Sequence, residues 1–252
     1  GKAYGEEIAG KLGVGEIRQI WIKELNILDR CTSCHQGLRM EKLKGEQIPV
    51  VFRYHPQSWG DYQDLVKDHP FDKFGCTLCH GGKGYALTKE EAHFSRGKEG
   101  WLETFLSRDI AKEYGFSDFE RMPMMEINCN ICHRDEKETK GLKHINQARR
   151  LFEQKMCTCC HSYKVEGSTV GPDITYEGDK AADLFSYAYI KESDLKEIGM
   201  PLSVFSWHSL HFKNPWYVTL YTLMPPLKLN DDQVRELSML VLSYREIPGY
   251  LR

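Results

Sequence analysis

The chain has 252 residues, of which 41% are hydrophobic and 28% are charged, a balance typical of a globular protein with one or two domains. Its formal net charge of −2 at pH 7 gives no indication of nucleic-acid binding, which relies on an excess of positive charge. The sequence contains no signal peptide and no apolar run long enough to cross a bilayer. We therefore expect Gly1 to be a mature or shortened start, from which an N-terminal anchor could have been removed.

Residues 16–30 lead into the first of four similar segments. The apolar residues of this stretch recur at helical spacing: Ile17, Ile20, Trp21, Leu25 and Leu28. The spacing predicts a helix that delivers the chain to the first segment. Between residues 36 and 75, glycines and prolines recur often, which predicts a loop with little regular structure.

The four similar segments share the pattern Cys-x-x-Cys-His, which is the attachment signature of a c-type haem. Two thiols three positions apart on one turn can form thioethers with the two vinyl groups at one edge of a porphyrin. The following His is then held under the iron as its proximal ligand. The sequence therefore predicts four covalently bound haems c. The attachment residues would be Cys31, Cys34, Cys76, Cys79, Cys129, Cys132, Cys157 and Cys160, and the proximal ligands His35, His80, His133 and His161.

Zinc sites and disulfide bonds are the two other common uses of many cysteines. Zinc sites do not need a His directly after every second Cys, as all four segments have here. Eight of the nine cysteines belong to the four segments, so no set is left for a disulfide framework. The ninth, Cys159, lies inside the fourth segment but at the wrong spacing for attachment. We expect it to be a free thiol that behaves as a small buried apolar residue.

Each iron also needs a second, distal ligand, and a neutral imidazole is the commonest group that supplies one. His55, His69 and His93 lie in the loops around the second segment and are predicted to be distal ligands. Which iron each one serves is left open by the sequence. Minor candidates are Met122, Met124 and Met125, and the reserves His144, His208 and His211 are expected to be mostly non-ligands.

The glycine-rich stretch after the second segment, residues 81–84, does not match a phosphate-binding loop. It lacks the Lys-Ser/Thr that such loops carry and has no obvious preceding strand. We interpret its glycines as positions where the backbone passes close to a porphyrin face. Further along, residues 101–114 have the apolar spacing of a helix.

The last hundred residues predict a separate helical unit. Residues 146–156 are amphipathic and run directly into the fourth segment, and residues 179–198 also predict a helix. A short helix is expected before Asn214. At the end of the chain, Asn230 is a predicted cap, and acidic residues occupy the first turn of the helix that follows. The expected buried stripe of this helix is Val234, Leu237, Val241 and Tyr244.

This order of elements resembles the class I cytochrome c fold over residues 144–247. The matching features are a helix into Cys-x-x-Cys-His, the loop Gly171-Pro172-Asp173, the loop Leu223-Met224-Pro225-Pro226, and a C-terminal helix. The resemblance implies that Met224 is the distal ligand opposite His161. One departure is Ala148, where the family usually has glycine at the helix crossing.

The first 140 residues resemble a group of bacterial multihaem cytochromes that is often associated with cytochrome b-type, quinol-oxidising membrane complexes. The resemblance is carried by the stretches at residues 29–35, 52–56, 69–76 and 92–93. It implies three haems with two His ligands each, followed by one with His and Met. We therefore predict a mainly α fold with extensive loops and no sheet of consequence. A three-haem region with multihaem cytochrome packing, residues 1–140, would precede a class I cytochrome c-like domain, residues 141–252.

The expected function is electron transfer between redox partner proteins, not catalysis, because six non-motif histidines and Met224 can fill all four distal positions. Methionine raises the potential of its haem relative to histidine, so the fourth haem is the expected electron sink. Covalent haem attachment occurs outside the cytoplasm, so we expect a periplasmic or other extracytoplasmic location, with any membrane association through a lost anchor or a partner. Two alternatives are a reductase or peroxidase with one open iron, and a subunit of a polymeric cytochrome wire.

Overall fold

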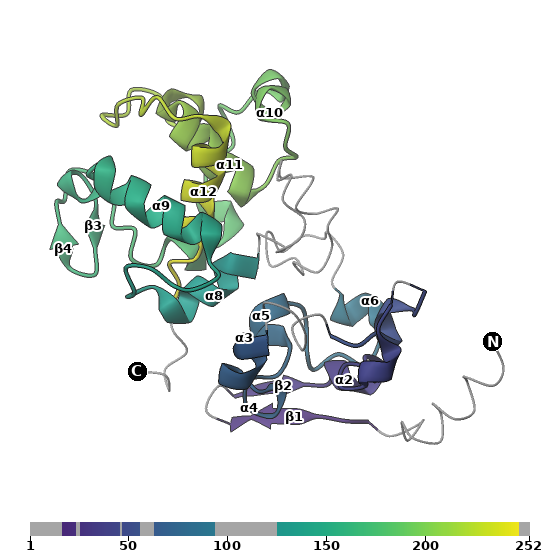
Figure 1. Ribbon diagram of the computed structural model, residues 1–252. Coiled ribbons are helices and arrows are strands. Elements are labelled where there is room, and N and C mark those ends of the chain that lie inside the picture. The colour runs from purple at the N-terminus through teal and green to yellow at the C-terminus, as the bar shows by residue number, and fades with distance from the viewer. Residues whose placement is uncertain (1–16, 24–25, 46, 56–62, 94–124, 247–252) are drawn as a thin grey trace. The chain divides into compact units, whose positions relative to one another are not determined.

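The computed structural model describes residues 17–23, 26–45, 47–55, 63–93 and 125–246 (Figure 1). The chain forms two compact units. Unit 1 comprises residues 1–78 and 82–94, and unit 2 comprises residues 79–81 and 95–252. Helices dominate the described residues, as the sequence predicted. The helix predicted at residues 101–114 lies outside the described residues.

Unit 1 is built from one small hairpin and a series of short helical segments. Its elements are β1 (Ile20–Ile22), β2 (Ile27–Asp29), α2 (Cys31–Cys34), η2 (Glu41–Leu43), η3 (Val50–Phe52), α3 (Gln63–Asp68), α4 (Phe71–Phe74) and α6 (Lys89–Ala92). The helix α5 (Thr77–His80) spans the division between the units. The expectation of little regular structure at residues 36–75 holds only in part, because four of these short helices lie there.

The helix predicted at residues 16–30 is wrong, because this stretch forms the antiparallel hairpin β1–β2. Ile20 pairs with Asp29 and Ile22 pairs with Ile27. Asn26 at the turn has a φ of 46°, a left-handed backbone conformation that ends an α-helix. Trp21 is 61% exposed whereas Ile22 is 4% exposed. Neighbouring side chains therefore point to opposite faces, as they do in a strand. β-branched isoleucines also favour the pleated conformation.

Unit 2 contains the longer helices. Its elements are α8 (Met125–His133), α9 (Lys143–Gln154), η6 (Cys157–Cys159), β3 (Ser162–Tyr163), β4 (Glu166–Gly167), η7 (Glu177–Asp179), η8 (Ala182–Leu184), α10 (Glu192–Ile198), α11 (Val204–Lys213), η9 (Pro215–Tyr217) and α12 (Asp231–Leu242). The prediction of one helix at residues 179–198 is too long, because only α10 is α-helical there. Phe185 has an extended backbone (φ −96°, ψ 131°), and its ring packs against Trp207 with ring centroids 5.0 Å apart.

The C-terminal helix α12 is the centre of unit 2, where it packs between α9 and α11 (Figure 1). Its predicted cap is confirmed, since Asn230 Oδ1 accepts a hydrogen bond of 2.9 Å from the Gln233 backbone N–H. The predicted apolar stripe is buried, including Tyr244 just beyond the end of the helix. The helices predicted at 146–156 and before Asn214 are also present, as α9 and α11.

Helix α8, which carries the third Cys-x-x-Cys-His segment, belongs to unit 2. It packs against both α9 and α12. Ile127 of α8 is fully buried in the same core cluster as residues of those two helices. The division seen in the structure therefore differs from the expected boundary at 140/141, because the third segment lies with the fourth in one compact unit.

We predict that Ala148→Leu destabilises unit 2 by about 1–3 kcal/mol, because Ala148 is fully buried on the face of α9 that enters the core. Extra methylene groups there would force neighbouring helices apart. Chemical unfolding followed by far-ultraviolet circular dichroism measures the change. Gln147→Leu is the matched control, since Gln147 is exposed on the same helix, and its stability should stay near that of the wild type. Equal stability of the two variants would contradict this packing.

Candidate functional site

All four Cys-x-x-Cys-His segments adopt a helical turn. In the first segment the His35 backbone N–H donates to Cys31 O at 2.8 Å, and in the fourth His161 donates to Cys157 O at 2.9 Å. The second segment forms α5 and the third ends α8. Positions i, i+3 and i+4 lie on one face of a helical turn, so both thiols and the imidazole of each segment are presented together.

The buried carboxylate of Asp29 joins the start of the first segment to the start of the second. Its Oδ1 accepts a hydrogen bond from the Cys31 backbone N–H at 3.0 Å. Its Oδ2 accepts from the backbone N–H groups of Cys76 at 2.7 Å and Thr77 at 2.8 Å, and from the Thr77 hydroxyl at 2.7 Å. Asp29 therefore holds two attachment segments that are more than forty residues apart in sequence against each other.

The ligand atoms of Asp29, Cys31 and Cys76 lie within 4.8 Å of one another, a cluster that could in principle hold a metal ion. The carboxylate is already engaged, however, because both of its oxygens accept hydrogen bonds from the protein. Burial alone would raise the pKa of Asp29, but the hydrogen bonds from Thr77, Cys76 and Cys31 together lower it below its usual value. The cluster is thus better explained as a structural anchor than as a metal site.

None of the nine cysteines, all of which lie among the described residues, forms a disulfide bond. Cys76 is buried, and Cys34, Cys132 and Cys160 are exposed. The expectation of a buried Cys159 is wrong, because Cys159 is also exposed. The reason is local, since Cys159 falls between the two attachment positions and the short η6 turn directs it away from the core.

In the fourth segment the orientation of His161 is set by its Nδ1 atom, which lies 2.9 Å from Pro172 O. Because a carbonyl oxygen can only accept, Nδ1 carries the proton and Nε2 keeps the lone pair that binds a metal. Gly171 packs against this ring, and a Cβ atom at Gly171 would lie 2.7 Å from His161 Cε1. A ring held this closely, with Nε2 as the available donor, fits the proximal ligand of a haem.

In the third segment His133 is oriented by a carboxylate. His133 Nδ1 lies 2.7 Å from Glu136 Oε1, and Thr139 Oγ1 donates to Glu136 Oε2 at 2.7 Å. The hydrogen bonds from His133 and Thr139 lower the pKa of Glu136, so it is ionised at neutral pH. From α9, Arg149 donates to His133 O at 2.7 Å and to Asn130 Oδ1 at 2.5 Å. These bonds fix the end of α8 to the core of unit 2.

Of the three predicted distal histidines, His93 lies beside a proximal one. The His35 and His93 ring centroids are 6.0 Å apart. Burial and the neighbouring His93 lower the pKa of His35, which favours the neutral form that binds metals. His55 instead lies against Phe71, with ring centroids 5.4 Å apart, and His69 against Phe74, at 5.1 Å. The assignment of His55 and His69 to particular irons stays a prediction.

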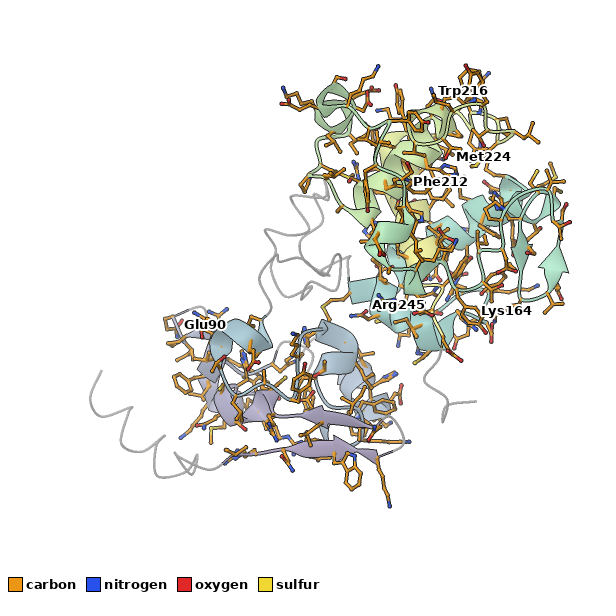
Figure 2. All side chains as sticks on the ribbon, turned by 180° about the vertical axis from the view of Figure 1, so that it is seen from behind. Glu90, Lys164, Phe212, Trp216, Met224 and Arg245 are labelled. Carbon is orange, nitrogen blue, oxygen red and sulfur yellow. The ribbon has the colours of Figure 1, made fainter. Side chains whose placement is uncertain are left out.

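Met224 lies in the loop before α12, is partly buried, and packs against the core of unit 2 that includes Phe212 (Figure 2). Its role as an iron ligand stays a prediction. Met122 and Met124 lie outside the described residues, and Met125 is the first residue of α8.

The three reserve histidines have separate environments in unit 2. His208 uses both ring nitrogens, at 2.8 Å from Val204 O and 3.2 Å from Glu177 Oε1, and so has none left for iron. His144 Nδ1 lies 3.2 Å from Glu236 Oε1. His211 stacks on Trp207 with ring centroids 5.2 Å apart. Burial, together with His208 and His161, lowers the pKa of His211 to about 3.

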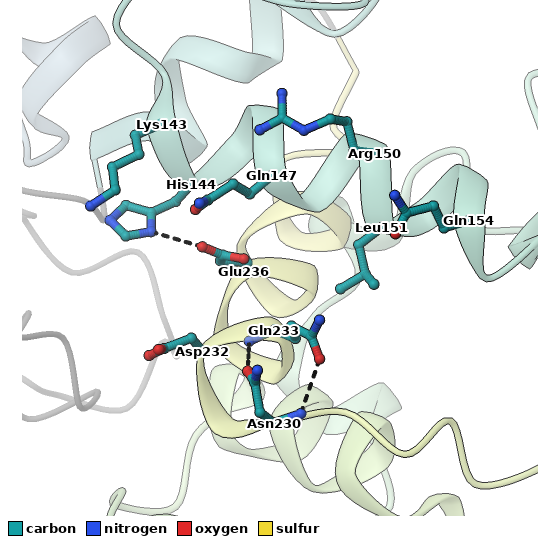
Figure 3. Close-up of a pocket in the computed structure, with 10 residues that line it drawn as sticks. All are labelled: Lys143, His144, Gln147, Arg150, Leu151, Gln154, Asn230, Asp232, Gln233 and Glu236. Carbon is teal, nitrogen blue, oxygen red and sulfur yellow. Dashed lines mark hydrogen bonds and ion pairs between the residues drawn. The ribbon is translucent and has the colours of Figure 1, made fainter.

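A pocket of about 460 Å³ opens between α9 and α12 (Figure 3). Its walls carry mainly polar and charged side chains, among them the His144–Glu236 pair, and no residue of the four segments lines it. A porphyrin needs apolar walls and a nearby attachment segment. This pocket is therefore separate from the candidate haem sites.

No family model, curated protein or solved structure matches the chain. The interpretation therefore rests on the residues themselves, and the donor set fits covalently bound haem. Each segment presents two thiols and one imidazole on one face, and His133 and His161 are oriented through Nδ1. Sequence reasoning missed Asp29, Glu136 and Arg149. Of these three residues, only Asp29 had a signal in the sequence, because an Asp two residues before Cys31 can cap the turn that begins there.

We predict that Asp29→Asn lowers the free energy of unfolding by about 2 kcal/mol at pH 7, because an amide cannot accept all the hydrogen bonds that the carboxylate accepts. The folded-state pKa of Asp29 is lowered, so its contribution is present above pH ~4 and is lost as the pH falls through the folded-state pKa. Urea unfolding at pH 7 and in acid should show the difference between the two proteins shrinking in acid.

Asp72→Asn is the matched control, since Asp72 is an exposed residue of unit 1 that pairs with Arg39 at the surface. Its stability should change little at either pH. If Asp29→Asn behaves like this control, Asp29 does not anchor the two segments.

Proposed function

We propose that this protein is a tetrahaem c-type cytochrome that carries electrons between redox partners outside the cytoplasm. The observation that supports this most strongly is the common helical turn of the four Cys-x-x-Cys-His segments, which presents two thiols and an imidazole on one face each time. A c-type haem, when bound, supplies an iron that changes between ferric and ferrous states by one electron.

The side chains around these segments favour a carrier over an enzyme. Candidate second ligands are present in both units, with His93 beside His35 in unit 1 and Met224 packed against the core of unit 2. An iron that has two protein ligands offers no open position to a substrate. Histidine ligands oriented through Nδ1, as His133 and His161 are, also change little in position during oxidation and reduction.

The thiols of Cys31 and Cys76 belong to different segments but lie within 4.8 Å of each other. Anchors this close attach two cofactors side by side, which favours electron transfer between them. A lone catalytic haem would have no use for such an arrangement. The contact depends on Asp29, which ties the backbone beside both thiols.

The redox partners follow from the resemblance of the first 140 residues to cytochromes associated with quinol-oxidising, cytochrome b-type membrane complexes. We propose such a complex as the electron donor and a downstream redox protein as the acceptor. No helix in the described part of the chain is long and apolar enough to cross a membrane.

A redox titration followed by electron paramagnetic resonance tests the proposal on protein produced with its cofactors attached. We expect four low-spin centres, because two protein ligands at each iron give a strong ligand field. Mass spectrometry should show four covalently bound haems. A persistent high-spin centre that binds carbon monoxide or cyanide would favour a reductase or peroxidase instead, and fewer than four haems would contradict the proposal.

We also predict that the fourth haem has the highest potential, because a thioether stabilises ferrous over ferric iron relative to imidazole. Met224→Leu should abolish the sulfur-to-ferric-iron charge-transfer band in the far red. Met224→His should keep the haem low-spin but shift the highest redox wave down toward the others.

His211→Phe is the matched control for this prediction, since His211 is a partly buried histidine of unit 2 whose pKa His161 affects. The far-red band should survive in His211→Phe. If the band and the highest wave survive in Met224→Leu but change in His211→Phe, His211 is the ligand and the assignment of Met224 is wrong.

A further inference from the structure

His35 and His93 lie fifty-eight positions apart in sequence but side by side in unit 1. Their ring centroids are 6.0 Å apart, and their planes are inclined at 69°. His35 directly follows α2, which carries Cys31 and Cys34, and His93 directly follows α6.

Backbone hydrogen bonds bring His93 to this position. The Arg30 backbone N–H, next to Cys31, donates to Gly84 O at 2.7 Å. The Lys83 N–H then donates to Ala92 O, next to His93, at 3.1 Å. The stretch after the second segment is thereby bonded through Gly84 to the residue before Cys31, and through Lys83 to the residue before His93.

The glycine at position 84 is required for this close approach. A Cβ atom at Gly84 would lie 2.4 Å from Thr77 Oγ1 and 2.9 Å from Leu28 O, which is closer than atoms can pack. The glycine-rich stretch therefore lets this backbone pass against the protein beside the first two segments. Close approach of this stretch to a porphyrin stays a prediction.

The nitrogen atoms of His93 are also arranged for metal binding. Its Nδ1 lies 2.9 Å from Lys89 O, so Nδ1 is the donor and Nε2 keeps its lone pair. The helix that supplies this carbonyl is capped by Thr88 Oγ1, which accepts from the Glu91 N–H at 3.3 Å. The His93 ring is thus positioned through the hydrogen bonds of α6.

We propose that His35 and His93 are the two axial ligands of one iron, that of the haem attached to Cys31 and Cys34. With an iron–nitrogen distance of about 2 Å and about 1 Å from Nε2 to the ring centre, two imidazoles on one iron have centroids about 6 Å apart. The observed separation of 6.0 Å matches this value. The inference rests on the proposed function, in which the first segment carries a haem.

Ring separation alone would not decide the matter, because ordinary aromatic contacts span about 4.5–7 Å. Three further observations favour ligation: His35 is the His of an attachment segment, Nδ1 of His93 faces the Lys89 carbonyl, and backbone bonds from beside Cys31 hold the pair together. His55 and His69 lie against Phe71 and Phe74, whereas His93 lies beside His35, the His of this segment.

The decisive test compares His93→Ala in two backgrounds, the full chain and a Cys31→Ala/Cys34→Ala chain that lacks the first haem. In the full chain we expect one low-spin centre to become high-spin while four haems remain attached. In the three-haem chain, His93→Ala should leave all three centres low-spin, because the iron that His93 binds is gone.

His69→Ala is the matched control, because His69 Nδ1 also lies close to the carbonyl oxygen four residues earlier, at 3.1 Å from Leu65 O. It should still convert one centre to high-spin in the three-haem chain. A new high-spin centre caused by His93→Ala in that chain, or four unchanged low-spin centres in the full chain, would overturn the ligand pair alone. A wild-type protein without a haem on Cys31 and Cys34 would overturn the proposed function as well.

A second measurement does not depend on the three-haem chain being stable. His35→Met and His93→Met in the full chain should each alter the same low-spin resonance signal and raise the same redox wave, because both would place a thioether on one iron. The inclined ring planes further predict that this signal is of the strongly anisotropic type. If the two substitutions change different signals, the two histidines serve different irons and the proposal fails.

Discussion

Each attachment segment can present two thiols and an imidazole together only while its residues form one helical turn. An isolated turn of four or five residues is unstable in water, because fixing its backbone costs more than its few hydrogen bonds return. The surrounding chain therefore has to hold each turn in place. In unit 1 this is done by Asp29, which is fully buried and binds the first backbone N–H groups of two turns through one carboxylate. The nearness of Cys31 to Cys76 follows directly from that single group.

The turns of the first two segments are held at their starts and the turn of the third segment at its end, and the charges suit those ends. A helix carries partial positive charge at its first N–H groups and partial negative charge at its last carbonyls. Asp29 places a negative charge at the starts of α2 and α5, and Arg149 places a positive charge at the end of α8 through His133 O. Arg149 also fixes α8 to α9, so the third segment shares the core that supports the fourth.

Three of the histidines share a second arrangement, in which the Nδ1 atom faces an acceptor oxygen. The acceptors differ: a carbonyl of the preceding turn for His93, the carboxylate of Glu136 for His133, and Pro172 O for His161. An ionised acceptor makes the imidazole a stronger donor than a carbonyl does, and a stronger donor stabilises ferric iron. In the proposed cytochrome, irons with the same ligands would thereby have different potentials, which suits electron flow through several haems.

The sequence by itself predicted four segments that each place two thiols and an imidazole on one face of a helical turn, and the structure shows these turns, while the attachment of haem to them stays a proposal. It also determined α9 and α12, whose long amphipathic patterns, together with the cap at Asn230, favour a single conformation. Residues 16–30 were different, since apolar spacing over a short stretch fits a helix or a hairpin. In the folded protein, the left-handed turn at Asn26 and the burial of Asp29 favour the hairpin β1–β2 over a helix. The pairing of His93 with His35 was likewise decided by the tertiary structure, because it depends on backbone bonds between residues more than fifty positions apart, such as Arg30 and Gly84, and no local pattern encodes them.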